Sequence, residues 1–357
     1  MADVEKLEKL AKLVRFYILK MTTKAGSGHP TSSLSAADIM VGLFFNTLRF
    51  DLNNPQNPAN DRVIFSKGHA SPLLYALYAA AGALSEKDIE SYRQFKSPLE
   101  GHPTPNFKFA EVATGSLGQG LSIGLGMALA MKSDYRLPTT NYPLPKVYVL
   151  MGDSEVSEGS VWEAIELASY YSQKSSAYKL DNLVGIIDVN RLGQSGETML
   201  GWDTETYKKR VEAFGWQAQV VDGHDFYKIV EAFESIKPNS EKPRMIIAKT
   251  IKGKGVSFLE NKEGWHGKAL GQEDYEKAIK ELGEVDQSVR GEIARPVSSI
   301  KYQVLRKNTK YKIQNTKYGL GEMVATRKAY GEALVKLGAQ NPNVVVLDAD
   351  VKNSTYT

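Results

Sequence analysis

The sequence predicts an α/β protein, a doubly wound parallel sheet with helices on both of its faces. Two observations lead to this fold class. First, five short apolar runs have the composition of buried strands: Arg62 to Phe65, Val147 to Met151, Asn182 to Val189, Gln217 to Val221 and Met245 to Lys249. Second, segments with helical spacing of apolar residues lie between these runs. Strands that alternate with helices favour a parallel sheet, because each crossover returns the chain to the same edge.

The first part of the chain predicts two helices around a shaped loop. Val4 to Met21 carries apolar residues at helical spacing and predicts a helix. Lys24 to Thr31 contains two glycines, a histidine and a proline, which indicate a loop. Ser33 to Leu48 predicts an amphipathic helix, capped by Ser33 or Ser35, with Asp38 in its first turns.

Further helices are predicted from the same periodicity. One covers Pro72 to Ala81, and another covers Ser85 to Phe95, where Ser85 and Asp88 resemble a capping box. A small-residue helix continues through Met131, and its glycines allow close packing on a neighbour. The other predicted helices cover residues 160–171, 204–214, 225–236 and 327–338, and a last strand covers Val344 to Leu347.

These elements suggest three regions. Residues 1–275 contain the alternating strands and helices of the first domain. Residues 276–322 are charged and poorly periodic, which indicates a linker on the surface. Residues 323–357 begin a new pattern of helix and strand, the start of a second, truncated domain. We find no internal repeat and no low-complexity tract.

Composition limits the classes of function. The chain has 357 residues, a formal net charge of +4 and no cysteine, so disulfides, zinc–thiolate sites and cysteine nucleophiles are excluded. The basic residues are dispersed, so nothing points to nucleic acid. The N-terminus is charged and helical, unlike a signal peptide. The longest apolar run, Leu121 to Met131, is too short to span a membrane. We expect a cytoplasmic protein with no membrane partner.

Two strand ends carry oxygen ligands suited to a divalent metal. Gly152 and Asp153 follow the strand Val147 to Met151, and Asn190 follows the next strand along the chain. Open α/β sheets bind ligands at the carboxyl ends of their strands. A carboxylate, an amide oxygen and a backbone carbonyl form a hard oxygen set that suits Mg²⁺ or Ca²⁺. The sequence therefore predicts that Asp153 and Asn190 converge on one metal ion.

The five histidines all lie in loops that contain glycine or proline. A single histidine of this kind is usually a surface or core-edge residue, and we interpret His224 in this way. The other four are His29, His69, His102 and His266, in G-H-P, K-G-H-A, G-H-P and W-H-G settings. Their similar settings favour one shared polar pocket, in which imidazoles orient hydroxyls and phosphates or transfer protons.

A glycine-rich segment, residues 115–120, opens the small-residue helix. Backbone amides at a helix N-terminus can bind anions, although such segments are often only packing devices. The segment is neither a Walker loop nor a good Rossmann fingerprint. Lys252 and Lys254 lie among glycines and could reach phosphate, although solvated lysines are the ordinary alternative. Glu155 and Glu158 are most simply acids favoured by the helix dipole.

A series of ordered motifs runs through nearly the whole chain. It includes K-A-G-S-G-H-P-T-S (24–32), S-K-G-H-A (66–70), E-G-H-P (100–103), V-A-T-G-S-L-G-Q-G-L (112–121), M-G-D-S-E-V-S-E-G (151–159), D-V-N-R-L-G-Q-S (188–195), V-D-G-H (221–224), A-K-T-I-K-G-K-G (248–255), W-H-G-K (265–268) and A-T-R-K-A-Y-G (325–331). Together these motifs resemble the N-terminal, diphosphate-binding portion of the transketolase family of thiamine-diphosphate enzymes. The residues of the 188–195 and 325–331 motifs are similar to those of the animal-type branch of the family.

The resemblance implies the thiamine diphosphate-binding fold, with thiamine diphosphate and Mg²⁺ as cofactors and Ca²⁺ or Mn²⁺ as substitutes for Mg²⁺. It implies that Asp153, Asn190 and the carbonyl of Leu192 hold the metal, in agreement with the oxygen set above. The residues that it implies for cofactor binding are Ser32, His69, Gly115, Ser116, Leu117, Ser154, Glu155, Asn190, Gln194, Lys252 and His266.

The resemblance also implies an activity, the transfer of a two-carbon ketol unit from a ketose phosphate to an aldose phosphate in the pentose phosphate pathway. It makes His29, His69 and His266 the catalytic residues near the reacting carbons, and His29, His102 and His266 the sugar-phosphate ligands. The implied partner is the second subunit of a homodimer, or a complementary chain, that carries the pyrimidine-binding domain.

Three departures from the family pattern matter. Ser154 stands where the family usually has glycine, and we expect binding to survive. Ser172 to Ala177 looks like an inserted polar surface loop. The sequence ends at Thr357, just inside the pyrimidine-binding domain and before the glutamate that the family uses to protonate the cofactor ring. We therefore expect the polypeptide alone to bind Mg²⁺ and diphosphate weakly and not to turn over.

Other functions remain open at this point. One is a different thiamine-diphosphate enzyme, such as dihydroxyacetone synthase or deoxyxylulose-phosphate synthase. Another is the N-terminal subunit of a split enzyme. A third is a catalytically silent binding or regulatory partner of a full-length enzyme. The retained histidines favour an enzyme, since a binding partner does not require them.

Overall fold

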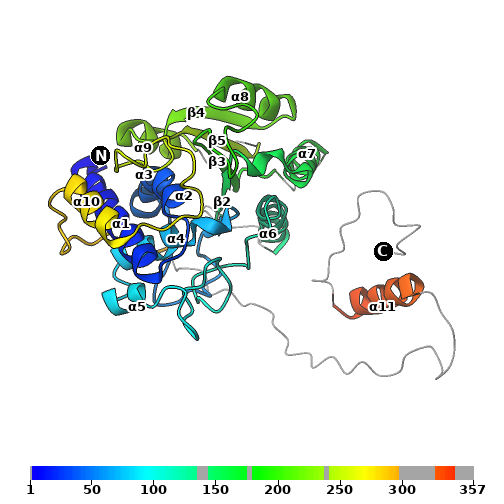
Figure 1. Cartoon of the computed structure of the whole chain (residues 1–357). Coiled ribbons are helices and arrows are strands. Elements are labelled where there is room, and N and C mark those ends of the chain that lie inside the picture. The colour runs from blue at the N-terminus through cyan, green and yellow to red at the C-terminus, as the bar shows by residue number, and fades with distance from the viewer. Residues whose placement is uncertain (1, 135–143, 175–178, 237–240, 297–325, 342–357) are drawn as a thin grey trace. The chain divides into compact units, whose positions relative to one another are not determined.

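The computed structural model describes residues 2–134, 144–174, 179–236, 241–296 and 326–341 (Figure 1). Within these residues, a five-stranded sheet forms the centre of the first of two units, Met1–Lys301. Its strands are β1 (Arg62–Phe65), β2 (Val147–Gly152), β3 (Leu183–Val189), β4 (Gln217–Asp222) and β5 (Arg244–Lys249). They lie in the order β1-β2-β3-β5-β4, and every neighbouring pair is parallel. The predicted fold class is confirmed, and the predicted strand limits agree to within one residue.

Helices connect and cover the strands. In the first unit they are α1 (Val4–Ala25), α2 (Pro30–Ser35), α3 (Ala37–Gly42), α4 (Ser71–Ala80), α5 (Glu86–Glu90), α6 (Gly120–Asp134), α7 (Gly159–Lys174), α8 (Thr204–Ala213), α9 (Phe226–Glu234) and α10 (Gln272–Leu282). Short helical turns occur at η1 (Leu43–Thr47), η2 (Gly68–Ala70) and η3 (Glu155–Ser157). The second unit, Tyr302–Thr357, contains α11 (Thr326–Gln340), which confirms the helix predicted over residues 327–338.

The sheet is covered on both faces, as its apolar strands require. Side chains of a strand point alternately to opposite faces. Tyr148 and Leu150 of β2 join the core that α1, α3, α4 and α9 form on one face. Val147 and Val149 join a second core, formed with α6, α7 and α8 on the other face (Figure 1). Every residue of β2 and β3 is buried, so the strand ends at the sheet edge have fixed positions.

The register of β2 and β3 brings the two predicted metal-binding strand ends together. Gly152 is paired with Asp188, and the Asp153 N–H donates to the Asp188 carbonyl at 3.3 Å. Asp153 and Asn190 therefore leave the sheet side by side, at the carboxyl edge where ligands of open α/β sheets bind.

The amphipathic helix predicted over Ser33 to Leu48 is wrong in its limits and in its character. Helix α2 begins at Pro30, whose fixed φ suits the first helical turn, and the helical path is interrupted at Ala36 before α3. Every residue of α2 and α3 is buried. Neither serine caps a helix: the Ser33 hydroxyl donates to the His29 carbonyl, and the Ser35 hydroxyl donates to the Ser32 carbonyl and to Asp188.

The capping box predicted at the start of α5 is confirmed, but this helix is shorter than predicted. The Ser85 hydroxyl accepts from the Asp88 N–H, and the Asp88 carboxylate accepts from the Ser85 N–H. Arg93 and Lys96 both have left-handed backbones, with φ of 60° and 68°. The right-handed helix therefore cannot continue to Phe95.

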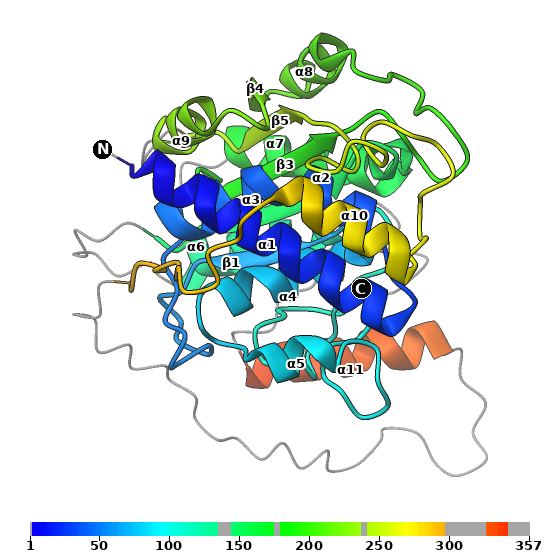
Figure 2. The same ribbon diagram turned by 60° about the vertical axis from the view of Figure 1, so that its left-hand side comes forward.

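The linker predicted over residues 276–322 begins inside a helix. In α10, Tyr275, Ala278, Ile279 and Leu282 form one apolar stripe that packs against the α1 side of the core. The two helices lie side by side in both views (Figure 1, Figure 2). Many charged residues on the solvent face of α10 hide this stripe in the sequence. Residues 297–322 lie outside the described residues, and the predicted domain boundaries remain predictions.

Two further predictions concern segments next to undescribed residues. Ser172 to Lys174, predicted as part of an inserted loop, are the last residues of α7, and residues 175–178 lie outside the described part of the chain. The strand predicted over Val344 to Leu347 also lies outside it. Across the described residues, no helix has both the length and the apolar character that a membrane span requires.

Candidate functional site

Four histidines meet at one site, as their loop settings predicted. The ring centroid of His29 lies 5.1 Å from that of His69, 5.1 Å from that of His266 and 6.3 Å from that of His102. The rings of His69 and His266 are 5.4 Å apart. The four residues come from separate loops, before α2, after β1, before α6 and after β5. The structure therefore brings these four side chains together in one cluster, as their loop settings predicted.

The histidine cluster is held in its neutral form. Burial, together with repulsion from His102 when it is protonated and from Arg93, lowers the pKa of His29 to about 4. Burial and the Lys252 ammonium lower the pKa of His266 to about 3. Burial also lowers the pKa of His69 and of His102. A neutral imidazole offers one donor and one acceptor. At neutral pH the cluster therefore suits hydroxyl groups that both accept and donate.

Acidification should destabilise the fold through His29. Its folded pKa of about 4 lies below the ordinary 6.5, so between these values the unfolded chain binds a proton that the folded chain does not. The contribution of His29 is thus complete above pH 6.5 and is lost as the pH falls towards 4. We expect a loss of roughly 1 kcal/mol at pH 5, after allowance for solvent screening.

Urea unfolding of the wild type and of His29→Gln at pH 7 and pH 5 checks this prediction. The variant should lose less stability on acidification than the wild type. Equal losses for both proteins would contradict the linkage to His29.

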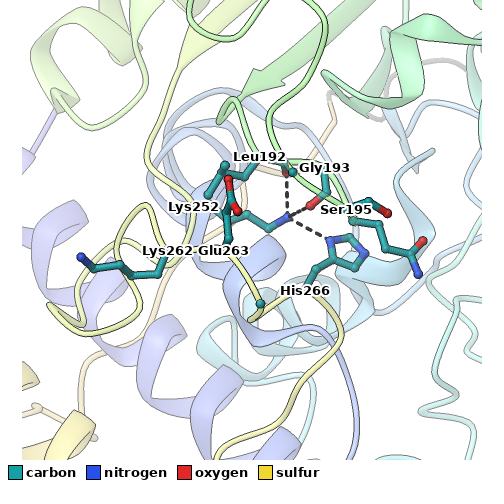
Figure 3. A pocket seen from close by; sticks show the side chains of 10 residues that line it. Leu192, Gly193, Ser195, Lys252, Lys262, Glu263 and His266 are labelled. Carbon is teal, nitrogen blue, oxygen red and sulfur yellow. Dashed lines mark hydrogen bonds between the residues drawn. The ribbon is translucent and has the colours of Figure 1, made fainter.

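Lys252 joins the histidine cluster to the loop that follows β3. Its ammonium donates to the Leu192 carbonyl at 2.7 Å and to the Gly193 carbonyl at 3.0 Å, and its Nζ lies 2.9 Å from His266 Nδ1. Figure 3 shows Lys252 pointing towards these groups in a cavity of about 230 Å³, which Gln194 also lines. Burial, with the nearby Lys67, lowers the pKa of Lys252 to about 8. The side chain therefore keeps its proton at neutral pH and can attract an anion.

The Asp153 carboxylate binds the peptide group that joins Asn190 to Arg191. The Asp153 carboxylate accepts hydrogen bonds from the Arg191 N–H at 2.7 Å and from the Ser154 N–H at 2.9 Å. The Asn190 side-chain oxygen accepts from the Leu192 N–H at 3.2 Å. Burial and the neighbouring Asp188 raise the pKa of Asp153 to about 6. The two residues are brought together at the sheet edge, as the metal prediction requires.

The chemistry of this donor set fits a hard divalent cation. Asp153 is 3% exposed, and the ion pairs of the described residues include none to its carboxylate. The Leu192 carbonyl accepts a hydrogen bond from the Lys252 ammonium, and both residues line the cavity. In the described part of the chain, no three histidines or carboxylates are grouped as metal ligands. The predicted set has a single carboxylate and otherwise amide and carbonyl oxygens, so it differs from a group of that kind. Magnesium binding stays a prediction.

A buried ion pair beneath the site was missed by the sequence analysis. The Lys67 ammonium lies 2.5 Å from the Asp188 carboxylate, with side chains 1% and 0% exposed. Lys67 also donates to the Ser32 carbonyl at 3.0 Å, and Ser35, Thr250 and Asn190 donate to Asp188. Although burial opposes ionisation, the Lys67 charge keeps the pKa of Asp188 below its ordinary value.

This network links α2, the end of β1 and the ends of β3 and β5 under the histidine cluster. A signal for it was present in the sequence, because Asp188 is the one charged residue in the strand β3 and Lys67 comes two residues after the end of the strand β1.

The glycine-rich segment before α6 is bound to a carboxylate of the chain itself. Glu155 accepts hydrogen bonds from the Gly118 N–H at 2.9 Å, the Gly152 N–H at 3.1 Å and the Ser66 hydroxyl. The Gly120 N–H donates to Ser66 at 3.1 Å. The Gly118 and Gly120 amides of this segment therefore already have hydrogen-bond partners. Through its contacts with Ser66, Gly152 and Gly118, Glu155 connects the ends of β1 and β2 to the loop before α6. Direct contact between Glu155 and a cofactor stays a prediction.

Of the other predicted cofactor residues, Gly115 lies against the histidine cluster, and Ser154 lies next to Gly193, which lines the cavity. A Cβ at Gly115, where φ is +142°, would lie 3.0 Å from the His102 ring, so this backbone lies directly against the cluster. Ser154 has a right-handed backbone, so this position does not need the usual glycine for its φ. Its hydroxyl would be 2.9 Å from a Cβ at Gly193. Ser116 is exposed and Leu117 half-buried in the α6 loop.

His224 has a structural role, in agreement with its interpretation as a core-edge residue. Its Nε2 accepts from the Ile251 N–H at 2.9 Å, so its Nδ1–H donates to Asp38 at 2.8 Å. Arg15 forms two hydrogen bonds of 2.7 Å to the same carboxylate. Burial opposes ionisation of Asp38, but the Arg15 guanidinium keeps its pKa well below the ordinary value. These contacts join α1, α3 and the loop after β5.

Comparison with known proteins agrees with this arrangement. The family described as "Transketolase, thiamine diphosphate binding domain" matches residues 7–324. Transketolase from Homo sapiens is 46% identical over 358 residues, which cover 99% of this chain and 55% of that protein. Transketolase-like protein 2 from Bos taurus is 46% identical over 353 residues, 99% of this chain and 54% of that protein. The chain spans about half the length of these relatives.

Solved structures show the same fold. The transketolase of Campylobacter jejuni aligns with a TM-score of 0.81 and 32% identity, over 99% of this chain and 58% of that chain. A Pichia stipitis transketolase in complex with sedoheptulose 7-phosphate aligns with a TM-score of 0.70 and 28% identity, over 81% of this chain and 42% of that chain. The family match over most of the residues, together with the assembled site, shows that this chain belongs to the transketolase family.

Proposed function

We propose that this chain binds thiamine diphosphate with a divalent metal, preferably Mg²⁺. We further propose that its four clustered histidines form part of an active site that transfers a two-carbon ketol unit between sugar phosphates. The observation that carries the proposal is the meeting of four neutral histidines beside the strand ends of Asp153 and Asn190. Two buried polar atoms at this pocket, His29 Nδ1 and Thr114 Oγ1, have no hydrogen-bond partner among the described residues. Buried polar groups without partners are rare, so these atoms support a ligand in the pocket.

The metal and the diphosphate would be held at the sheet edge. Asp153, Asn190 and the Leu192 carbonyl would ligate the metal, because they offer the oxygen donors that Mg²⁺ prefers. Lys252 would contact a diphosphate oxygen, since its ammonium already lies among carbonyls of the same loop. Gln194, which lines the cavity, would donate a further hydrogen bond.

The histidines would bind the sugar and move protons. When bound, the thiazolium ring of the cofactor supplies an electron sink for cleavage of a carbon–carbon bond. His29, His69 and His266 would orient the hydroxyls next to the reacting carbons and transfer their protons, and His102 would bind the sugar phosphate. Their lowered pKa values keep these imidazoles neutral at neutral pH, so each offers a hydrogen-bond acceptor to a hydroxyl group of the sugar. The pyrimidine side of the cofactor would be bound by a second subunit or a complementary chain.

Titration calorimetry tests the first part of the proposal. The chain is titrated with thiamine diphosphate in Mg²⁺ and in a chelator, and with thiamine that lacks the diphosphate. We expect binding of thiamine diphosphate in Mg²⁺, a large loss of affinity in the chelator and no measurable binding of thiamine. Equal affinity with and without metal would overturn the proposed site.

An assay of ketol transfer then tests the catalytic role. Transfer from xylulose 5-phosphate to ribose 5-phosphate is measured for the chain alone and after addition of a C-terminal transketolase half as a separate polypeptide. We expect turnover only in the combined sample, because the chain would supply one side of the cofactor site. Robust turnover by the chain alone would disprove the need for a complementary part.

A further inference from the structure

Arg191 adopts an unusual backbone conformation between two predicted metal-binding residues. Its φ is +62°, in the left-handed region that side chains other than glycine and asparagine rarely adopt. Asn190 precedes it and Leu192 follows it in the chain. A strained conformation of this kind persists only where the surrounding structure holds it. The contacts of Arg191 therefore show what holds this loop.

The Arg191 side chain is held by three different groups. Its Nε donates to the Asn261 side-chain oxygen at 2.7 Å. Its Nη1 lies 3.0 Å from the Glu197 carboxylate. Its guanidinium lies 5.0 Å from the ring centroid of Trp202, a distance typical of cation–π contacts. Together, the Asn261 amide, the Glu197 carboxylate and the Trp202 ring fix the orientation of the Arg191 side chain.

The backbone of Arg191 makes the contacts that shape the metal loop. Its N–H donates to Asp153 Oδ2 at 2.7 Å, and its carbonyl accepts from the Thr198 N–H at 2.7 Å. The N–H is part of the peptide that joins residues 190 and 191, and the carbonyl is part of the peptide that joins residues 191 and 192. A rotation of the Arg191 backbone would therefore move the Asn190 and Leu192 oxygens relative to Asp153.

Asn261 connects this side chain to Lys252. Its N–H donates to the Lys252 carbonyl at 2.8 Å, and its own backbone is left-handed, with φ of +55°. The Lys252 ammonium returns to the Leu192 carbonyl at 2.7 Å. Arg191, Asn261, Lys252 and Leu192 thus form a closed ring of contacts between the loop after β3 and the loop after β5.

We propose that Arg191 is a positioning residue that holds the Asn190–Leu192 loop in its left-handed turn, so that three oxygen ligands converge on the metal. This inference rests on the proposed function, because it concerns the same metal site. Residues that orient metal ligands without touching the metal commonly change metal affinity 10- to 100-fold. The Arg191 side chain acts in this way through Asn261 and Trp202.

The principal variant is Arg191→Gly, since glycine adopts φ near +60° without strain and the variant should fold. Arg191→Lys keeps a cation that can lie over Trp202, but it lacks the Nε donor that bonds Asn261. Lys249→Ala is the matched control. Lys249 is exposed, and its ammonium lies 5.5 Å from the same Trp202 ring, so this variant removes a cation from the ring without altering the contacts of Arg191.

Titration calorimetry with thiamine diphosphate is carried out over a series of Mg²⁺ concentrations. We expect Arg191→Gly to raise the Mg²⁺ concentration needed for half-saturation about 10- to 100-fold. Arg191→Lys should show a smaller shift, and Lys249→Ala should stay within about twofold of the wild type. Asn261→Gly should add little to Arg191→Gly, because both remove the same contact. A wild-type Mg²⁺ dependence in Arg191→Gly would overturn the proposal.

Hydrogen exchange without ligand separates this inference from the proposed function. We expect the amides of residues 190–198 to exchange faster in Arg191→Gly than in the wild type, and those of β2 and β3 to exchange as in the wild type. Unchanged exchange in the loop would overturn the positioning role even if the wild type binds thiamine diphosphate. A wild type that fails to bind thiamine diphosphate would overturn the proposed function, and the exchange would still decide the role of Arg191.

Discussion

Asp153→Asn should abolish the metal-dependent binding of thiamine diphosphate and leave the fold intact. The change removes the single carboxylate of the predicted oxygen set and keeps the shape of the side chain. Because changes to groups that merely support a metal ligand cost 10- to 100-fold in affinity, loss of a ligand itself should cost at least about 100-fold. Titration calorimetry in Mg²⁺ measures this loss.

The stability of the same variant provides a second measurement. Burial and Asp188 raise the pKa of Asp153 to about 6, so at neutral pH the fold holds a carboxylate that it disfavours. Asparagine removes this charge but keeps only one of the two oxygens that accept from the Arg191 and Ser154 N–H groups, so the two effects oppose each other. We therefore expect the stability of the variant without ligand to lie within about 1 kcal/mol of the wild type in urea. Asp203→Asn is the control, because it makes the same chemical change at an exposed helix cap. Undiminished binding by Asp153→Asn would refute the assignment of the metal site.

Lys67→Met should be strongly destabilising. The substitution removes the ammonium from a pair whose side chains are 1% and 0% exposed, and it leaves the Asp188 charge buried. Removal of one partner from a buried ion pair typically costs about 3–5 kcal/mol, because the remaining charge is uncompensated. Methionine keeps most of the volume of lysine, so the loss reports on the charge rather than on a cavity. Urea unfolding at pH 7 measures it.

A double variant distinguishes the ion pair from general packing. Asp188→Asn removes the charge that Lys67→Met leaves unpaired, so the two changes together should cost less than the sum of their separate costs. Additive costs, or a loss below about 1 kcal/mol for Lys67→Met, would show that the pair does not stabilise the fold in this way.

Local patterns were sufficient for most of the secondary structure. The strands have β-branched, apolar compositions that differ from the surrounding sequence, so their limits could be predicted. The helix α10 was missed because its apolar residues, Tyr275, Ala278, Ile279 and Leu282, are few among many charges. The helix predicted over Ser33 to Leu48 failed for a different reason. Its polar residues indicate a solvent-facing side, but Asp38 and Ser35 are buried against Arg15 and Asp188, which lie far away in the sequence.

Some residues of the candidate site could likewise be predicted from local sequence, and others could not. Asp153 and Asn190 could be associated from the sequence because parallel strands end at the same edge of a sheet. The four histidines could be grouped because their loop settings are alike. Neither argument reaches Arg191, since its left-handed φ is imposed by Asn261, Trp202 and Asp153, and nothing in the local sequence indicates it.

Residue types and their order were thus enough to establish the fold class, the family resemblance and the chemistry available in this protein. The folded chain alone decided that β5 lies between β3 and β4, that Lys67 pairs with Asp188, and that Glu155 accepts from the Gly118 amide of the loop before α6. The physical reason is that strand and helix periodicity depends on near neighbours. Hydrogen bonds between buried charges instead depend on segments that approach each other only after the sheet has formed.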